Sequence, residues 1–192
     1  MSVIVIEFIT LDGFVSDPDG AGGTPRGGWM FRFGPEAVSG DKFQLGPVLD
    51  DGVMMLGRKT WELFASIWPG RDDPFSVRMN KVPKLVVSRT LTDVSAWANS
   101  EIVADPLEVV RQEERDVIIT GSLSVVHPLI AAGLVDEYRL RAFPTLLGAG
   151  ERLFPEGGPM TELECLTVEQ VGGTVFARYV RQRLGRPATM GR

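Results

Sequence analysis

Residues 53–64, VMMLGRKTWELF, change from a strand pattern to a helix pattern within a few positions, and this junction constrains the fold more than any other stretch. Val53–Leu56 is a short apolar run typical of a buried strand, Gly57 interrupts it, and Thr60–Phe64 has the pattern of the first turns of a helix. A helix that begins there points its unpaired backbone N–H groups at the strand's carboxyl end, where their partial positive charge suits a phosphate. The stretch predicts an α/β fold, with either an anion site or an ordinary solvated basic turn at this point.

The residues after Gly57 carry groups that could bind an anion. Arg58 and Lys59 add two positive charges, and the Thr60 hydroxyl can cap the helix or bond a phosphate oxygen. The junction is therefore a candidate phosphate site.

The rest of the chain alternates apolar runs with helical patterns and ends in a hairpin signal, Gly172-Gly173. This order predicts one mostly parallel sheet with helices on both faces and a C-terminal antiparallel hairpin. We expect one domain, residues 1–184, and a flexible tail, residues 185–192. The predicted strands are 3–11, 53–56, 84–87, 101–103, 116–120, 135–143, 163–170 and 174–183, and the predicted helices are 35–49, 60–67, 75–81, 106–114 and 122–132.

Composition narrows the function classes. The net charge of −5 and the lack of a basic stripe argue against a nucleic-acid partner. The sequence contains no run of eighteen apolar residues, so no membrane-spanning helix is expected. Cys165 and His127 are the only residues of their kinds, which excludes an intrachain disulfide and a Cys/His zinc site, so no metal is expected. His127 lies in an apolar helical segment and is interpreted as structural. We expect a cytoplasmic protein with a small-molecule substrate.

Two further strand ends carry groups suited to a dinucleotide. The third predicted strand ends in Ser88, Arg89 and Thr90, two hydroxyls around a guanidinium, and the fifth ends in Gly121 and Ser122 at a helix start. Ligands of open α/β sheets bind beyond the carboxyl ends of the strands. These ends together indicate a phosphorylated dinucleotide, and the extra charge at Arg89 favours NADPH over NADH. Neither a G-x-G-x-x-G nor a G-x-x-x-x-G-K-[ST] motif follows a strand.

The segment from Gly13 to Trp29 is rich in Gly and Pro and follows the first strand. Such a loop at the end of a buried strand is more often a binding lid than a linker. We expect it to close over the site.

Five motifs, TLDGFVS, LGRKTWE, LVVSRTL, DVIITGS and RLRAFPTLLGAGERLF, occur in this order between Val3 and about Arg183. With them the chain resembles the dihydrofolate-reductase-like superfamily, and within it the RibD C-terminal reductase group. The resemblance implies a stand-alone, NADPH-dependent reductase that forms a homodimer. In such proteins the positions of Gly57, Arg58, Lys59 and Thr60 hold cofactor phosphates, those of Ser88 and Arg89 the 2′-phosphate, and those of Gly121 and Ser122 the pyrophosphate. Thr90 and Leu123, next to these positions, are expected to bind the cofactor as well.

The resemblance also raises expectations about geometry and edge contacts. The family usually has Gly-Gly, with a first peptide that is often cis, where this chain has Gly121-Ser122. An apolar last strand near Thr174 to Val180, expected at the sheet edge, adds some support for the homodimer.

Two acids are candidate catalytic residues. Asp41 lies sixteen positions before Gly57, where the resemblance to dihydrofolate reductases implies a pterin-binding carboxylate on the first helix; it could equally be a solvated helix acid. Asp12, at the end of the first strand, lies near the expected nicotinamide site or simply forms a turn with Gly13. The implied substrate class is that of the ribosylaminouracil reductase step of riboflavin synthesis. A pterin reductase and a nucleotide-binding module without turnover are the alternatives.

Overall fold

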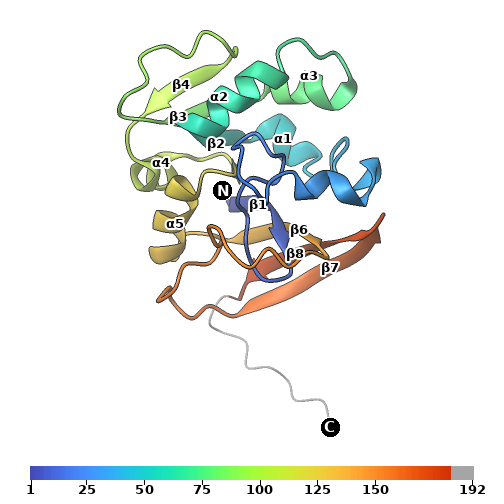
Figure 1. Ribbon diagram of the computed structural model, residues 1–192. Coiled ribbons are helices and arrows are strands. Elements are labelled where there is room, and N and C mark those ends of the chain that lie inside the picture. The colour runs from blue at the N-terminus through green and yellow to red at the C-terminus, as the bar shows by residue number, and fades with distance from the viewer. Residues whose placement is uncertain (183–192) are drawn as a thin grey trace.

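The computed structural model describes residues 1–182, which form one eight-stranded sheet in the order β4-β3-β2-β5-β1-β6-β8-β7 (Figure 1). The pairs from β4 across to β6 are parallel, and β8 and β7 are antiparallel. The predicted fold class is confirmed. The strands are β1 (Val3–Thr10), β2 (Val53–Gly57), β3 (Lys84–Val87), β4 (Ser100–Val103), β5 (Val117–Thr120), β6 (Glu137–Phe143), β7 (Leu163–Val171) and β8 (Thr174–Arg181).

Helices cover both faces of the sheet, because the central strands are apolar on both sides. In β1, Val3 and Val5 face one core while Ile4 and Ile6 face the other. The first core is closed by α4 and α5, the second by α1, α2 and α3. The helices are η1 (Trp29–Phe33), η2 (Pro35–Ala37), α1 (Pro47–Asp51), α2 (Arg58–Ile67), α3 (Pro74–Lys81), α4 (Pro106–Gln112) and α5 (Leu123–Ala131), with η denoting 3₁₀ turns.

The predicted helix over 35–49 is wrong. Only the ends of that segment are helical, as η2 and α1, and its middle is a chain of turns with positive φ at Gly40, Gln44 and Gly46. Asp41 lies in these turns and not on a first helix. Its carboxylate accepts the Leu45 and Gly46 N–H groups at 2.7 and 2.8 Å, an alternative to helical bonding that short polar side chains offer.

The junction after β2 forms as predicted, but the helix begins two residues earlier. Helix α2 starts at Arg58, and its N-cap, Gly57, makes no side-chain cap. Of the two roles expected for the Thr60 hydroxyl, the helix cap is therefore wrong, and the bond to a phosphate oxygen stays a prediction. The hydroxyl accepts a hydrogen bond from Ser122 Oγ in the loop after β5.

The hairpin differs from expectation in which strand forms the edge. Strand β8 lies between β6 and β7, so the edge strand is β7 and not the segment near Thr174 to Val180. In Figure 1 the hairpin and β4 lie at opposite ends of the sheet. The predicted strand end at Arg183 and the expected tail lie outside the described residues. No helix within residues 1–182 is long and apolar enough to cross a membrane.

Candidate functional site at the carboxyl ends of β2, β3 and β5

The structure brings the predicted ends of β2 and β5 into direct contact. The Gly57 N–H donates to Ser122 Oγ at 2.7 Å, and that hydroxyl donates to Thr60 Oγ1, also at 2.7 Å. A Cβ on Gly57 would lie 2.9 Å from Ser122 Oγ, and one on Gly121 would lie 3.2 Å from Thr60 Oγ1. A larger residue at either position would therefore crowd the other loop, and we call the two loops together the cradle.

Helix α5 begins at this cradle. Leu123 is its first residue, and Gly121 and Ser122 both have left-handed backbones, with φ of 57° and 62°. Every peptide bond within residues 1–182 is trans, so the family's frequent cis peptide is not found between Gly121 and Ser122. The first N–H groups of a helix have no intrahelical acceptor, which leaves those of α5 able to bind an anion.

The end of β3 presents a free positive charge. Ser88 Oγ accepts the N–H groups of Thr90 and Leu91 at 3.2 and 2.9 Å and so fixes the turn. Arg89 within that turn is exposed, and no carboxylate of residues 1–182 pairs with it. At β2, Arg58 pairs with Glu62 at 2.9 Å, while Lys59 is exposed and has no ion pair in the described chain.

A buried acid, Glu7, lies under the cradle, and sequence reasoning missed it. The Gly121 N–H donates to Glu7 Oε2 at 3.1 Å, and the residue is only 7% exposed. Burial raises the pKa of Glu7 to about 8 against the opposing effect of the Gly121 hydrogen bond. The signal was available, because Glu7 is the only charged residue in the apolar run VIVIEFIT.

Asp12 and Asp41 both bind backbone in loops. Asp12 accepts the Thr10 hydroxyl and the N–H groups of Leu147 and Gly148, at 2.6, 3.1 and 2.7 Å. Desolvation alone would raise the pKa of Asp12, but these hydrogen bonds outweigh it and lower the pKa to about 2. Asp12 is therefore a carboxylate at neutral pH and not a proton donor. A catalytic role for either acid stays a prediction.

The expected lid, Gly13 to Trp29, contains internal hydrogen bonds made by the Asp17 and Trp29 side chains. Asp17 accepts the N–H groups of Gly22 and Thr24 at 2.7 and 2.8 Å, and the Trp29 indole donates to Ser16 O at 3.0 Å. A cavity of about 430 Å³ lies beside this loop. Its lining residues are Pro25, Arg26, Trp29, Arg32, Thr145, Leu146 and Leu147. Closure of the loop stays a prediction.

The residues at the strand ends fit a phosphorylated dinucleotide. Ser122 Oγ already occupies the Gly57 N–H, so the first N–H groups of α5 would hold a pyrophosphate. Arg89 is an exposed cation without an ion pair in the described chain, at the end of β3 next to β2. His127 approaches Arg152 O at 3.0 Å, which agrees with its structural interpretation. Residues 1–182 contain no group of three or more His, Cys, Asp or Glu side chains that could hold a metal ion.

Comparison with known families decides the affiliation of the chain. The sequence model of the RibD C-terminal domain matches residues 1–177. The chain belongs to this family. The resemblance inferred from the five motifs is thereby confirmed.

Two uncharacterized Bacillus subtilis (strain 168) proteins are similar in sequence to this chain. YyaP is 29% identical over 110 residues, which span 53% of this chain and 58% of YyaP, and YwjB is 25% identical over 178 residues, 90% and 94% of the two chains. The chain thus aligns with little more than half of YyaP.

Two solved structures share the fold. A provisionally named riboflavin biosynthesis protein from Shewanella sp. PV-4 superposes with a TM-score of 0.72 at 22% identity, covering 95% of this chain and all of the other. A pyrimidine reductase-like protein from Corynebacterium diphtheriae gives 0.64 at 12% identity, covering 95% and 92%. These similarities confirm the dihydrofolate-reductase-like fold.

Proposed function

We propose that the protein is an NADPH-dependent reductase that transfers hydride to a C=N or C=O group of a small heterocyclic or sugar-linked substrate. The observation that carries the proposal is the contact between Gly57, Thr60 and Ser122, which joins the ends of β2 and β5 at the start of α5, with Arg89 at the end of the next strand, β3. Membership of the RibD C-terminal family supports a reductase role.

Each part of the site would have a distinct task in this reaction. Bound NADPH would supply the hydride. Ser122 and Leu123 would hold the pyrophosphate with backbone N–H groups, Gly121 would form the turn that leads into α5, and Arg58 and Lys59 would offset the phosphate charge. Ser88, Arg89 and Thr90 would bind the 2′-phosphate. The loop 13–29 would exclude water from the reacting atoms.

The substrate class follows the names of the fold relatives. One is assigned to riboflavin biosynthesis and the other is called pyrimidine reductase-like. We therefore propose reduction of a ribosylaminouracil, as in riboflavin synthesis. Asp12 is ionised at neutral pH, so it is not a candidate for the proton donor. Its carboxylate would instead accept a hydrogen bond from a water or a substrate N–H and so orient that group.

Stopped-flow absorbance of bound NADPH tests the proposal with a panel of aminouracils and pterins. We expect oxidation with an aminouracil carrying a ribosyl phosphate. A protein that binds no NADPH would contradict the proposal. Saturable NADPH binding without oxidation by any compound would favour a nucleotide-binding module.

We also propose that the protein is a homodimer. Strand β7 is an unpaired edge, and Leu166 and Val168 on it are 45% and 58% exposed, which suits coverage by a second copy. Light scattering at micromolar concentration is expected to give twice the 21.0 kDa of one chain. A mass of one chain would contradict the dimer.

A further inference from the structure

Arg141 on β6 is a buried cation without a carboxylate partner. It is 3% exposed, its Nη2 donates to Lys42 O, and its Nε and Nη1 have no hydrogen-bond partner. Arg139, two residues earlier on the same face of β6, shows the ordinary arrangement, because its Nε donates to Glu137 Oε1 at 2.7 Å. A buried guanidinium with free donors is costly unless something else pairs with it.

A second cation lies beside Arg141. The Lys42 Nζ lies 5.8 Å from the centre of the Phe8 ring, 5.5 Å from that of Phe75 and 6.0 Å from that of Trp68. No carboxylate of the described chain forms an ion pair with Lys42. Burial, and then the charge of Arg141 and a smaller effect of Arg71, lower the pKa of Lys42 to about 8 against the attraction of the Asp41 carboxylate. The two side chains therefore repel each other in the free protein.

The Trp68 indole adds a third donor to the same place. Its Nε1 is buried and has no acceptor. The other three indoles all have one, since Trp29 donates to Ser16 O, Trp61 to Ser100 Oγ and Trp97 to Asn80 Oδ1. Only Trp68, whose ring lies against Lys42, lacks a partner.

All the unpartnered groups in this cluster are donors. The single negative charge that acts on Arg141 is Glu169, an exposed residue of β7 whose Oε2 accepts from Gln44 Nε2 at 2.9 Å. Its attraction raises the pKa of Arg141 without overcoming the effect of burial. An oxyanion accepts hydrogen bonds and carries negative charge, so it is the kind of group that suits these donors and the two positive charges together.

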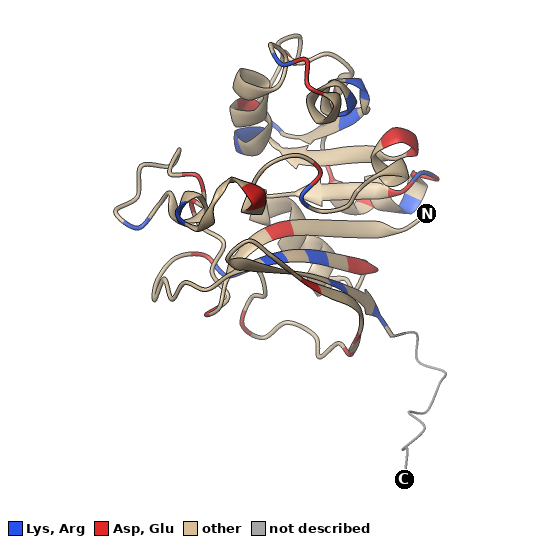
Figure 2. Cartoon of the chain, turned by 90° about the vertical axis from the view of Figure 1, so that its right-hand side faces the viewer, with Lys and Arg blue, Asp and Glu red and all other residues tan. Residues whose placement is uncertain are grey.

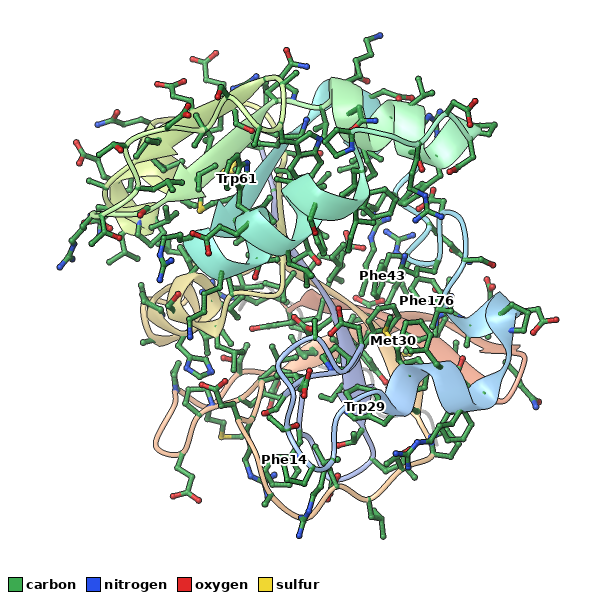
Figure 3. All side chains as sticks on the ribbon, turned by 45° about the horizontal axis from the view of Figure 1, so that its top comes forward. Phe14, Trp29, Met30, Phe43, Trp61 and Phe176 are labelled. Carbon is green, nitrogen blue, oxygen red and sulfur yellow. The ribbon has the colours of Figure 1, made fainter. Side chains whose placement is uncertain are left out.

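The cluster lies apart from the cofactor cradle but on the same sheet. Arg141 pairs in register with Phe8 of β1, and β1 separates β6 from β5, where the cradle lies. Aromatic rings surround the cations, with Phe8 and Phe43 5.1 Å apart and Arg141 5.4 Å from the Phe176 ring. Figure 3 shows Phe43 and Phe176 close together between the helices and the hairpin side of the fold, and Figure 2 shows basic residues within the strands there.

We propose that Arg141, Lys42 and Trp68 form an oxyanion subsite that binds the phosphate or carboxylate of a substrate whose ring packs against the surrounding aromatic side chains. The assignment of that anion to the substrate rests on the proposed reductase function. Binding of the anion itself does not depend on it.

The ¹H–¹⁵N resonance of the Trp68 indole, assigned with Trp68→Phe, tests the subsite in the free protein. Inorganic phosphate and benzoate, added separately, distinguish a phosphate from a carboxylate site. We expect one of them to shift this resonance saturably, and to bind about tenfold or more weakly to Arg141→Met and to Lys42→Met, since each variant loses a charged hydrogen bond. The matched control is Arg111→Met, an exposed arginine of α4 on the other face.

Three results would overturn the subsite: no saturable shift with either anion, a shift of equal affinity in both variants, or NADPH binding that weakens tenfold in Arg141→Met, which would make the anion a cofactor phosphate. Lys42 lies in a loop and is half-buried, so Lys42→Met decides the matter if Arg141→Met does not fold. If the wild-type protein binds no NADPH but an anion still shifts the Trp68 resonance saturably, only the reductase proposal is overturned.

Discussion

Replacing Arg89 with alanine is expected to weaken NADPH binding by roughly 10- to 150-fold while NADH binding changes little. The guanidinium is exposed and unpaired at the end of β3, so it can bind the 2′-phosphate through charge-assisted hydrogen bonds without first breaking another ion pair. Such bonds contribute roughly 1.5–3 kcal/mol, at about 1.4 kcal/mol per tenfold in affinity. Calorimetric titration with both cofactors measures the effect.

Arg58→Ala is the informative companion to Arg89→Ala. Its expected partner is a phosphate common to both cofactors, so both affinities should fall together. The fall should be smaller than that of Arg89→Ala for NADPH, because Arg58 already pairs with Glu62 at 2.9 Å and gives up part of that pairing on binding. Equal losses of NADPH and NADH affinity in Arg89→Ala would show that Arg89 does not bind the 2′-phosphate.

The sequence predicted the elements whose patterns depend on the central sheet. Strands β2 and β5 are short apolar runs followed by glycine, and their burial on both faces leaves little choice of conformation. Their parallel pairing then brings Gly57 and Ser122 together at one end. This part of the candidate site follows from local pattern and sheet topology.

The segment around Asp41 and its contacts with β6 could not be predicted in this way. The segment 35–49 has helix-compatible apolar spacing, but the Asp41 side chain binds backbone N–H groups that a helix would use. Likewise RLRAF reads as a half-exposed strand, yet Arg139 and Arg141 are both buried. They donate to carbonyl groups of Phe43, Gln44 and Lys42 in that same segment, a contact between residues almost a hundred positions apart.

Glu7→Gln is expected to remove a pH dependence of stability. The pKa of Glu7 is raised from 4.5 to about 8 in the folded protein, so between these values the folded chain holds a proton that the unfolded chain has released. Stability from this group is complete below about pH 4.5 and falls by up to about 1.4 kcal/mol per pH unit until about pH 8. The glutamine amide cannot ionise, but its oxygen can still accept a hydrogen bond from the Gly121 N–H. The stability of Glu7→Gln should therefore not fall over this pH range.

Urea unfolding of the two proteins at pH 5, 7 and 9 measures the difference. The variant and the wild type should be similar at pH 5, and the variant should be more stable by several kcal/mol at pH 9. Glu113→Gln is the matched control, because Glu113 is a half-buried acid outside the cradle, and the hydrogen bond from Arg115 lowers the pKa of Glu113 to about 2. Glu113→Gln should lower the free energy of unfolding by the same amount at all three pH values. If the free energy of unfolding changes with pH in the same way for Glu7→Gln and the wild type, the Glu7 carboxyl ionises in the folded protein as it does in water. Glu7 would then lie beneath the cradle as a charged carboxylate.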